Sequence, residues 1–221
     1  MQITAVNLVE MDSSLLFILI ATGFVSWQAN QRPDLKDKLL LHPFRVKHEN
    51  QWFRVLTHAF VHGDSTHLLV NLFVLWQFGV EVESDLASDS LVPLVKLPGN
   101  YSFLMLYFGG ILFAALPAML RHKNNPDYRS LGASGAVSAV LIFYIIHSPT
   151  DLLLLFFVIP IPAFLAGILF FVYEGYMDRK GGGRIAHDAH LYGGLYGLIF
   201  ALLSNDSAMT DFITAVENFL Y

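Results

Sequence analysis

The sequence contains no cysteine in 221 residues and little charge of either sign. Without cysteine, neither a disulfide framework nor a thiolate-ligated metal site can form. Charged residues make up 14% of the chain, whereas a soluble globular domain carries about 25%. The net charge of -5 comes without a basic tract, so the sequence offers no surface of the kind that binds nucleic acid. These absences exclude an ordinary soluble domain and indicate a lipid environment.

The chain is rich in long hydrophobic segments: 55% of its residues are hydrophobic and its mean hydropathy is +0.53. Apolar segments of about 17 to 25 residues are typical of membrane-spanning helices. Backbone polar groups must be paired inside hydrocarbon, and the alternation that a β-barrel needs is missing. We therefore predict an all-α polytopic membrane protein, a single domain over residues 1–221 in the lipid bilayer. Its six predicted transmembrane helices cover residues 12–28, 67–83, 101–120, 131–148, 152–173 and 186–204.

The first apolar segment and the connection after it differ from the rest. The segment lacks the basic start and small-residue cleavage site of a signal peptide, so we interpret it as a retained span. The connection, residues 29–66, begins with Pro, Lys and Arg and turns amphipathic in QWFRVLTHAFVH. We expect it to lie in or on the membrane interface rather than to span the bilayer.

A serine inside the fourth apolar segment is the first candidate for chemistry. Ser134 lies between Gly132 and Gly135 in the first turn of this segment, and His190 lies in the first turn of the sixth. His67 begins the second segment. Because consecutive spans alternate in direction, all three side chains are predicted at one membrane face and one shallow depth. A nucleophile and a base at the same level are the minimum for covalent hydrolysis.

Each of these residues also has a purely structural interpretation. A serine in a membrane helix usually bonds to its own i−4 carbonyl or packs among small residues, which suits Ser138 better than Ser134. His190 by itself is more often an interfacial histidine than a base, although polar groups inside a span are functional candidates. Gly193 and Gly197 form a G-x-x-x-G face that permits close helix packing. If the neighbouring helix is the fourth, His190 comes within hydrogen-bond reach of Ser134.

His67 and Asn71 are four residues apart and so share one face of the second helix. A tetrahedral intermediate needs preorganised donors, and a histidine N–H, an asparagine amide and the backbone N–H of Ser134 are suitable ones. The alternative is that both side chains are polar contacts between helices.

The sequence places no carboxylate beside His190. Asp188 would point about 200° away around the same helix. Glu83 follows His67 by 16 residues, which puts it at the other end of the second helix. We therefore predict a Ser–His dyad.

Taken together, these motifs resemble those of rhomboid intramembrane serine proteases. The residues that carry the resemblance are the G-x-S-G of Gly132 to Gly135, the A-H-x-x-G-x-x-x-G of Ala189 to Gly197, the H-x-x-x-N of His67 to Asn71, the spaced His58 and His62, Arg54 after Trp52-Phe53, and Glu83.

The resemblance implies a function and a set of roles. Ser134 would be the nucleophile, and His190 the general base and then acid. His67, Asn71 and the Ser134 N–H would hold the oxyanion, with the Gly132 backbone assisting. Substrates would be other membrane proteins, cut near the end of a transmembrane helix, without metal or cofactor. The structural positions would be Arg54, Glu83, Gly135, Gly193 and Gly197.

The loop before the sixth span caps the site in this family. Here that cap would be residues 174–185, starting at Glu174, with Gly181, Gly182 and Gly183 making it flexible.

Two departures from the family pattern concern His190. Relatives carry an aromatic residue one turn after the nucleophile, where this chain has Ser138. We expect another side chain, such as Tyr192 or Tyr196, to orient the histidine, or the histidine to be held less firmly. His187 is an additional histidine one turn earlier, for which we favour a loop or interfacial role over competition with His190.

The orientation in the membrane is predicted differently by two arguments. Of the 13 Lys and Arg residues, 12 lie on the side of the odd-numbered loops and Lys96 on the other. The positive-inside rule would place the first side in the cytoplasm. The resemblance implies the reverse, a bacterial inner membrane with the active site on the extracytoplasmic side, and we adopt this orientation.

Two other functions stay open at the level of sequence. A non-proteolytic rhomboid-like protein would bind membrane clients without cutting them, but such members lose the serine or the histidine. A metal enzyme could use His58 with His62 and His187 with His190, although no H-E-x-x-H motif is present.

Overall fold

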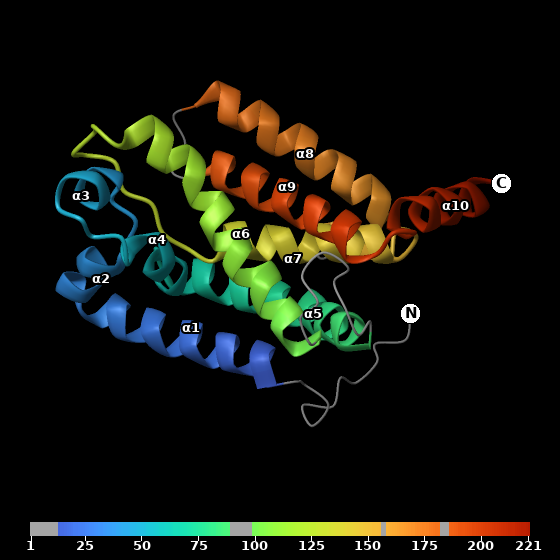
Figure 1. Ribbon diagram of the computed structural model, residues 1–221, viewed down its shortest axis with the longest axis horizontal. Coiled ribbons are helices and arrows are strands. Elements are labelled where there is room, and N and C mark those ends of the chain that lie inside the picture. The colour runs from blue at the N-terminus through green and yellow to red at the C-terminus, as the bar shows by residue number, and fades with distance from the viewer. Residues whose placement is uncertain (1–12, 89–98, 156–157, 182–185) are drawn as a thin grey trace.

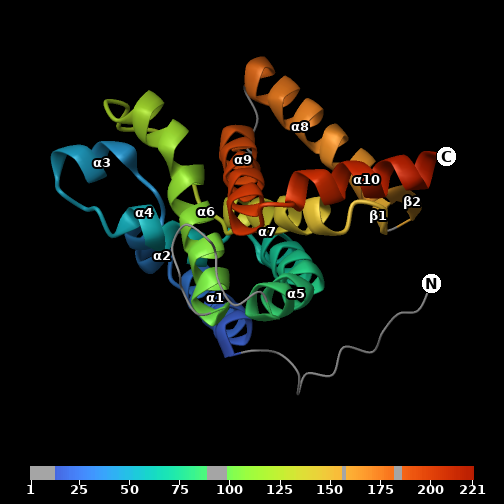
Figure 2. The same cartoon turned by 45° about the vertical axis from the view of Figure 1, so that its right-hand side comes forward.

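A computed structural model describes residues 13–88, 99–155, 158–181 and 186–221. These residues form ten α-helices, one short 3-10 helix (His58–Phe60) and one short β-hairpin. The helices in Figure 1 and the small hairpin in Figure 2 confirm a predominantly α-helical fold. The helices are α1 (Ser13–Gln31), α2 (Pro33–Leu39), α3 (Pro43–His48), α4 (Arg54–Thr57), α5 (Ser65–Ser88), α6 (Gly99–His122), α7 (Ser134–His147), α8 (Ala163–Lys180), α9 (His187–Ser204) and α10 (Ala208–Leu220).

The hydropathy of the individual described helices identifies fewer candidate membrane spans than the six predicted from the sequence. Within the described residues, one segment, Tyr101–His122 of α6, is long and apolar enough to cross a membrane by itself, and α7 is a shorter apolar helix. The number of spans therefore stays a prediction. Helix α10, after residue 204, was not predicted.

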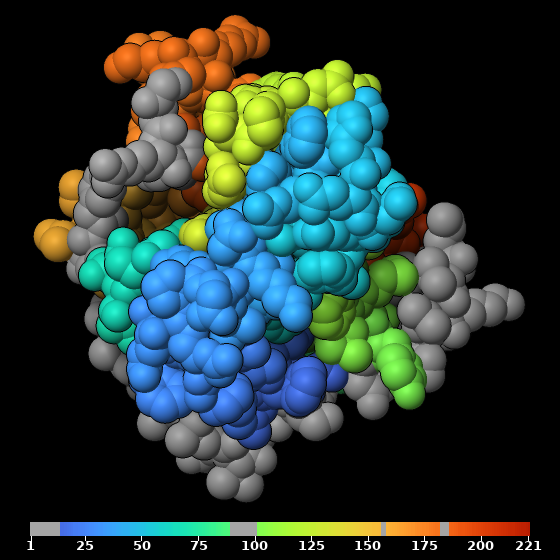
Figure 3. All heavy atoms as spheres, turned by 90° about the vertical axis from the view of Figure 1, so that its left-hand side faces the viewer, coloured from blue at the N-terminus to red at the C-terminus, as the bar shows by residue number. Residues whose placement is uncertain are grey.

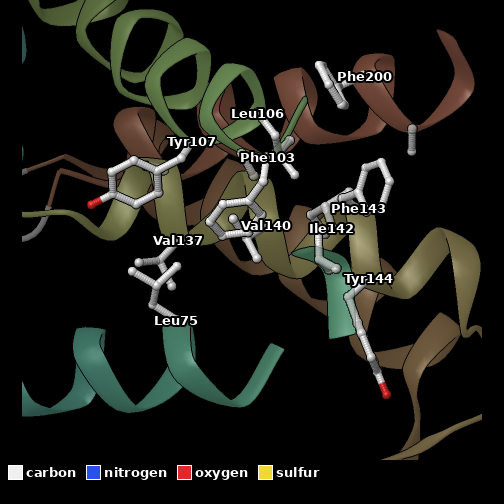
Figure 4. Packing of buried hydrophobic residues seen from close by; sticks show 14 of the residues in the cluster. Leu75, Phe103, Leu106, Tyr107, Val137, Val140, Ile142, Phe143, Tyr144 and Phe200 are labelled. Carbon is white, nitrogen blue, oxygen red and sulfur yellow. The ribbon is translucent and has the colours of Figure 1, made fainter. Parts of the chain in front are cut away.

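Helix α7 lies at the centre of the bundle, between α9 and α5 in both views (Figure 1 and Figure 2). Eleven of its fourteen residues are buried. A helix that is hydrophobic all round is typical of a protein core or of a membrane span, and here other helices cover most of it. Its neighbours α5, α6 and α9 supply that cover (Figure 4) through large side chains that include Leu75, Phe103, Leu106, Tyr107 and Phe200.

The contact between α7 and α9 is made by backbone against backbone. A Cβ atom placed on Gly197 would lie 2.7 Å from the Cα of Ala139, and one on Gly193 would lie 2.7 Å from the carbonyl carbon of Gly135. The glycine face of the sixth predicted span thus packs on the fourth, as the spacing predicted. This contact brings the N-terminal ends of the two helices together.

The fifth predicted span, residues 152–173, is wrong at its start. Strands β1 (Leu152–Leu155) and β2 (Ile159–Pro162) form an antiparallel hairpin there, and helix α8 begins only at Ala163. Pro160 and Pro162 explain the difference, because proline lacks the N–H that a helix needs and keeps the preceding residue extended.

The later end of α8 also corrects the predicted cap at residues 174–185. Helix α8 continues to Lys180, so Glu174 is helical rather than part of a loop. Gly182 and Gly183 lie outside the described residues, as does Lys96.

The long first connection folds into the short helices α2, α3 and α4, which cover much of one face of the molecule (Figure 3). Arg54 lies buried at the start of α4. Its guanidinium donates to the backbone carbonyls of Asp37 and Leu40, at 2.6 and 3.0 Å, and to the side chain of Gln51. One buried cation thereby ties the end of α2 to the start of α4.

Glu83 lies at the opposite end of α5 from His67, as expected. Its Oε1 accepts the backbone N–H of Leu15, at 2.9 Å, in the first turn of α1. The first N–H groups of a helix have no partner within the helix. The carboxylate supplies one and joins α1 to α5.

Candidate functional site

Ser134 and His190 meet at the junction of α7 and α9. The Ser134 Oγ lies 2.8 Å from the His190 Nε2, although the residues are 56 positions apart in the chain. Ser134 is the first residue of α7, and His190 lies in the first turn of α9. Ser138, one turn further along α7, donates to the backbone carbonyl of Ser134 at 2.8 Å. The packing interpretation is therefore confirmed for Ser138, whereas the Ser134 hydroxyl is directed at an imidazole.

The backbone before Ser134 takes a turn that favours glycine. Gly132 has a φ of +116°, and a Cβ atom there would lie 2.8 Å from the Cε1 of His67. The N–H of Gly132 donates to the carbonyl of His58, at 2.9 Å. That donor is already used, so the expected help of the Gly132 backbone in an oxyanion hole is not supported.

His62 holds the next residue of this turn. Its Nε2 accepts the backbone N–H of Ala133 at 3.2 Å, so its proton must be on Nδ1, which lies 2.7 Å from the Oγ of Ser26. Ser26 in turn donates to the carbonyl of Phe60. Burial lowers the pKa of His62 to about 3, with a smaller contribution from the charge of His67. A neutral His62 thus fixes the loop that presents Ser134.

The His58 ring is also held by a hydrogen-bond contact and is buried, like that of His62. Its Nδ1 lies 3.1 Å from the carbonyl of Arg54, and burial lowers its pKa to about 4. In the described residues, the group of side chains that could hold a metal ion is Glu174, His187 and His190. His58 and His62 do not belong to it, which removes half of the ligand set that the metal-enzyme alternative required.

His67 lies beside the turn at Gly132. Asp64 accepts the backbone N–H of His67 at 2.8 Å and so caps α5. The His67 Nδ1 accepts the N–H of Gly63 at 3.4 Å, which leaves the proton on Nε2. That nitrogen lies 3.1 Å from the position of a Cβ on Gly132. Among the described residues this Nε2–H has no acceptor, so it is an available donor beside Gly132, which precedes Ser134 by two residues.

Asn71 follows one turn after His67 and is buried. Its Nδ2 donates one hydrogen to the carbonyl of His67 at 2.8 Å. An amide nitrogen carries two hydrogens, so a second N–H stays for another acceptor.

A carboxylate lies next to His190, contrary to the sequence prediction. The Oε1 of Glu174 is 3.0 Å from the His190 Nδ1, and its Oε2 is 2.6 Å from the Nδ1 of His187. The expected role of Tyr196 in orienting His190 is not supported, because its hydroxyl donates to the carbonyl of Met105 instead.

One signal in the sequence could have identified Glu174. It is the only acid in the apolar run AFLAGILFFVYEGY, and a charged residue inside a span is a functional candidate by default. It precedes His190 by 16 residues. Because α8 and α9 are consecutive packed helices (Figure 1), the two residues can meet across the hairpin they form.

His187 is the first residue of α9 and is buried, rather than lying in a loop. Its ring stands edge-on to that of His190, with 6.1 Å between the ring centroids. Asp188 points elsewhere, as predicted, and forms an ion pair with Arg121 at 3.3 Å.

A small cavity adjoins Ser134. It measures about 20 Å³, and its lining includes Ser134, Gly135, Ala189 and residues of the first connection and of α6. About 10 to 15 Å³ is enough to hold one water molecule. The cavity is therefore large enough for a single water beside Ser134.

Comparison with known families matches residues 49–206 to the Rhomboid domain. The chain is 28% identical over 187 residues to RHOMBOID-like protein 12, mitochondrial, of Arabidopsis thaliana, which covers 80% of this chain and 54% of that protein. It is 31% identical over 145 residues to Presenilin-associated rhomboid-like protein A, mitochondrial, of Danio rerio, which covers 63% of this chain and 34% of that protein. The chain thus spans about half of the first relative and about a third of the second.

These relatives correct the predicted location. Both are mitochondrial proteins, so the expectation of a bacterial inner membrane with an extracytoplasmic active site was wrong. The sequence motifs that it rested on concern catalysis and helix order, and neither depends on the compartment.

Proposed function

The chain belongs to the rhomboid family, and from this premise we propose that it is an intramembrane serine endopeptidase. The observation that carries the proposal is the 2.8 Å contact between the Ser134 Oγ and the His190 Nε2. We further propose that α1, α5, α6, α7, α8 and α9 span the bilayer, and that the membrane is mitochondrial because both relatives are mitochondrial proteins. The partners would be the lipid bilayer and membrane-protein substrates.

The first chemical step is attack by Ser134 on a peptide carbonyl. His190 accepts the hydroxyl proton at Nε2 while the Oγ forms its bond to the carbonyl carbon. Negative charge then develops on the carbonyl oxygen. The free Nε2–H of His67, the second amide hydrogen of Asn71 and the N–H of Ser134 at the N-terminus of α7 are the donors available to it.

Collapse of this intermediate expels the amine, to which His190 returns the proton. The resulting acyl-enzyme ester is then hydrolysed by water, with His190 again acting as base. A store of one water beside Ser134 suits this second half-reaction in an apolar environment.

The substrate class follows from where the site lies. Peptide bonds within a regular helix are hydrogen-bonded and shielded by side chains, so a transmembrane segment must unwind locally before attack. The site lies at the N-terminal ends of α7 and α9, near the end of the bundle. Segments with small or helix-destabilising residues near one end are the expected substrates.

The alternative of a non-proteolytic rhomboid-like protein that binds membrane clients makes a different prediction. Such a protein has no need of an aligned hydroxyl and imidazole. The hydrogen bond between Ser134 and His190 favours the protease.

A fluorophosphonate probe tests the nucleophile without knowledge of the substrate. The wild type should be labelled, and Ser134→Ala and His190→Ala should not. Ser138→Ala is the matched control, because this serine lies one turn away and bonds only to its own helix; it should label like the wild type. Equal labelling of Ser134→Ala and the wild type, or no labelling of folded wild type, would refute the proposal.

A further inference from the structure

We propose that Glu174 is a positioning residue for His190, so that the site works as a Ser134–His190–Glu174 relay in place of a dyad. The proposal rests on the proposed protease function and adds a residue to it. It comes from the placement of one buried carboxylate between two imidazoles, on a helix other than the two that carry the serine and the histidine.

The tautomer of His190 is the first step of the argument. The base must accept the proton of Ser134 at Nε2, which lies 2.8 Å from the hydroxyl. A neutral imidazole carries its single proton on the other nitrogen in that case. Nδ1–H then needs an acceptor, and the Glu174 Oε1 lies 3.0 Å away. The carboxylate thus selects the tautomer that can act as a base.

The charge of Glu174 is the second step. Proton transfer from Ser134 turns His190 into an imidazolium in a site from which bulk water is largely excluded. An anion at hydrogen-bond distance stabilises that cation, and it does so more strongly when solvent screening is weak. The side chain of Glu174 is 9% exposed, against 18% for His190. A group so placed acts on the reaction through the histidine and does not touch the substrate.

His187 is the third part of the arrangement. Its Nδ1 lies 2.6 Å from the second oxygen of Glu174, so the carboxylate accepts one hydrogen bond on each oxygen. Two fixed donors restrict the rotation of the carboxylate and help to offset the cost of burying it. We assign to His187 the role of holding Glu174, which explains a histidine that the family pattern leaves without a function.

The surrounding charges leave this pairing intact. Arg121 on α6 binds Asp178 at 2.8 Å and Asp188 at 3.3 Å. His67 on α5 lies close enough to His190 for their charges to interact. Among the described residues, the titratable groups around the relay include His187, His67, Tyr173, Asp178, Asp188 and Arg121.

Glu174→Gln is the sharpest substitution, since it keeps the size and one acceptor oxygen while removing the charge. We expect kcat for cleavage of a model transmembrane substrate to fall about 10²-fold to 10⁴-fold, the range known for the loss of an orienting carboxylate or a base catalyst, with KM nearly unchanged. Glu174→Asp should recover part of kcat. Active-site titration with the fluorophosphonate corrects each rate for the fraction of folded protein.

Glu83→Gln is the matched control, because Glu83 is also a buried glutamate on a long helix but pairs with the N-terminus of α1. It should keep kcat within about threefold. His187→Gln leaves the Oε1 contact in place and should reduce kcat less than Glu174→Gln does. An unchanged kcat in Glu174→Gln, in an enzyme whose wild type labels at Ser134, would overturn the relay alone. A wild type that neither labels nor cleaves would instead overturn the protease proposal.

Discussion

Gly197 sets the distance between α7 and α9, and its substitution by alanine is the most direct test of how this packing serves the site. A Cβ atom there would lie 2.7 Å from the Cα of Ala139 and 2.8 Å from its carbonyl carbon. Carbon atoms in ordinary contact are about 3.5 to 4.0 Å apart. The obstacle is backbone and cannot rotate away. The two helices must therefore separate by roughly 1 Å to bring the new Cβ to an ordinary carbon–carbon distance from Ala139.

Two effects follow from a separation of this size. Overpacking in a well-packed core costs about 1 to 3 kcal/mol, so Gly197→Ala should unfold at a lower temperature in detergent. The second effect is on the 2.8 Å contact between Ser134 and His190, which lies two turns away at the same helix interface. A misplacement of about 1 Å in a catalytic pair reduces the rate by about 10²-fold. We expect a loss of kcat of that order in protein that still inserts.

The assay is cleavage of a model transmembrane substrate together with the rate of fluorophosphonate labelling, both per folded molecule. Gly23→Ala is the control, because Gly23 also lies within a long helix but its Cβ would meet only the Leu72 Cδ1, at an ordinary 3.8 Å. It should leave both rates unchanged. Wild-type rates in Gly197→Ala would show that the close approach of α7 and α9 does not set the geometry of the site.

Three further predictions concern single donors, pH and metal. Asn71→Ala should lower kcat about 10²-fold with little change in KM, because one oxyanion donor contributes about 10²-fold to 10³-fold and other donors remain. Ser134→Ala should instead lose activity completely. Equal loss in the two variants would contradict this prediction. Burial lowers the pKa of His62 from 6.5 to about 3, so the unfolded chain binds its proton more readily. The contribution of neutral His62 to the free energy of unfolding is then fully present above pH 6.5 and is lost as the pH falls toward 3. The unfolding temperature should therefore drop over this pH range, and it should drop less steeply in His62→Gln. Chelation with EDTA should leave cleavage unchanged; loss of activity that Zn²⁺ restores would favour a metal enzyme.

The sequence alone determined which residues could meet. Alternating span direction predicted that Ser134 and His190 share one end of the bundle, and the glycine spacing of α9 predicted the close contact that joins them. Both inferences depend on periodicity along a helix, which the backbone hydrogen bonds fix locally. The back-bonding of Ser138 was predictable for the same reason.

The surroundings of that pair depend on how distant segments of the chain pack together. Hydropathy averaged over a window of residues is insensitive to the two prolines before α8, so the prediction missed the hairpin there. It also ended this helix too early and placed Glu174 in a loop. The contact of Glu174 with His190 depends on how α8 lies against α9, and the use of the Gly132 N–H by His58 depends on where the first connection folds back. The placement of α8 and of the first connection is set by packing of side chains from distant parts of the chain, and no local pattern in the sequence gives those contacts.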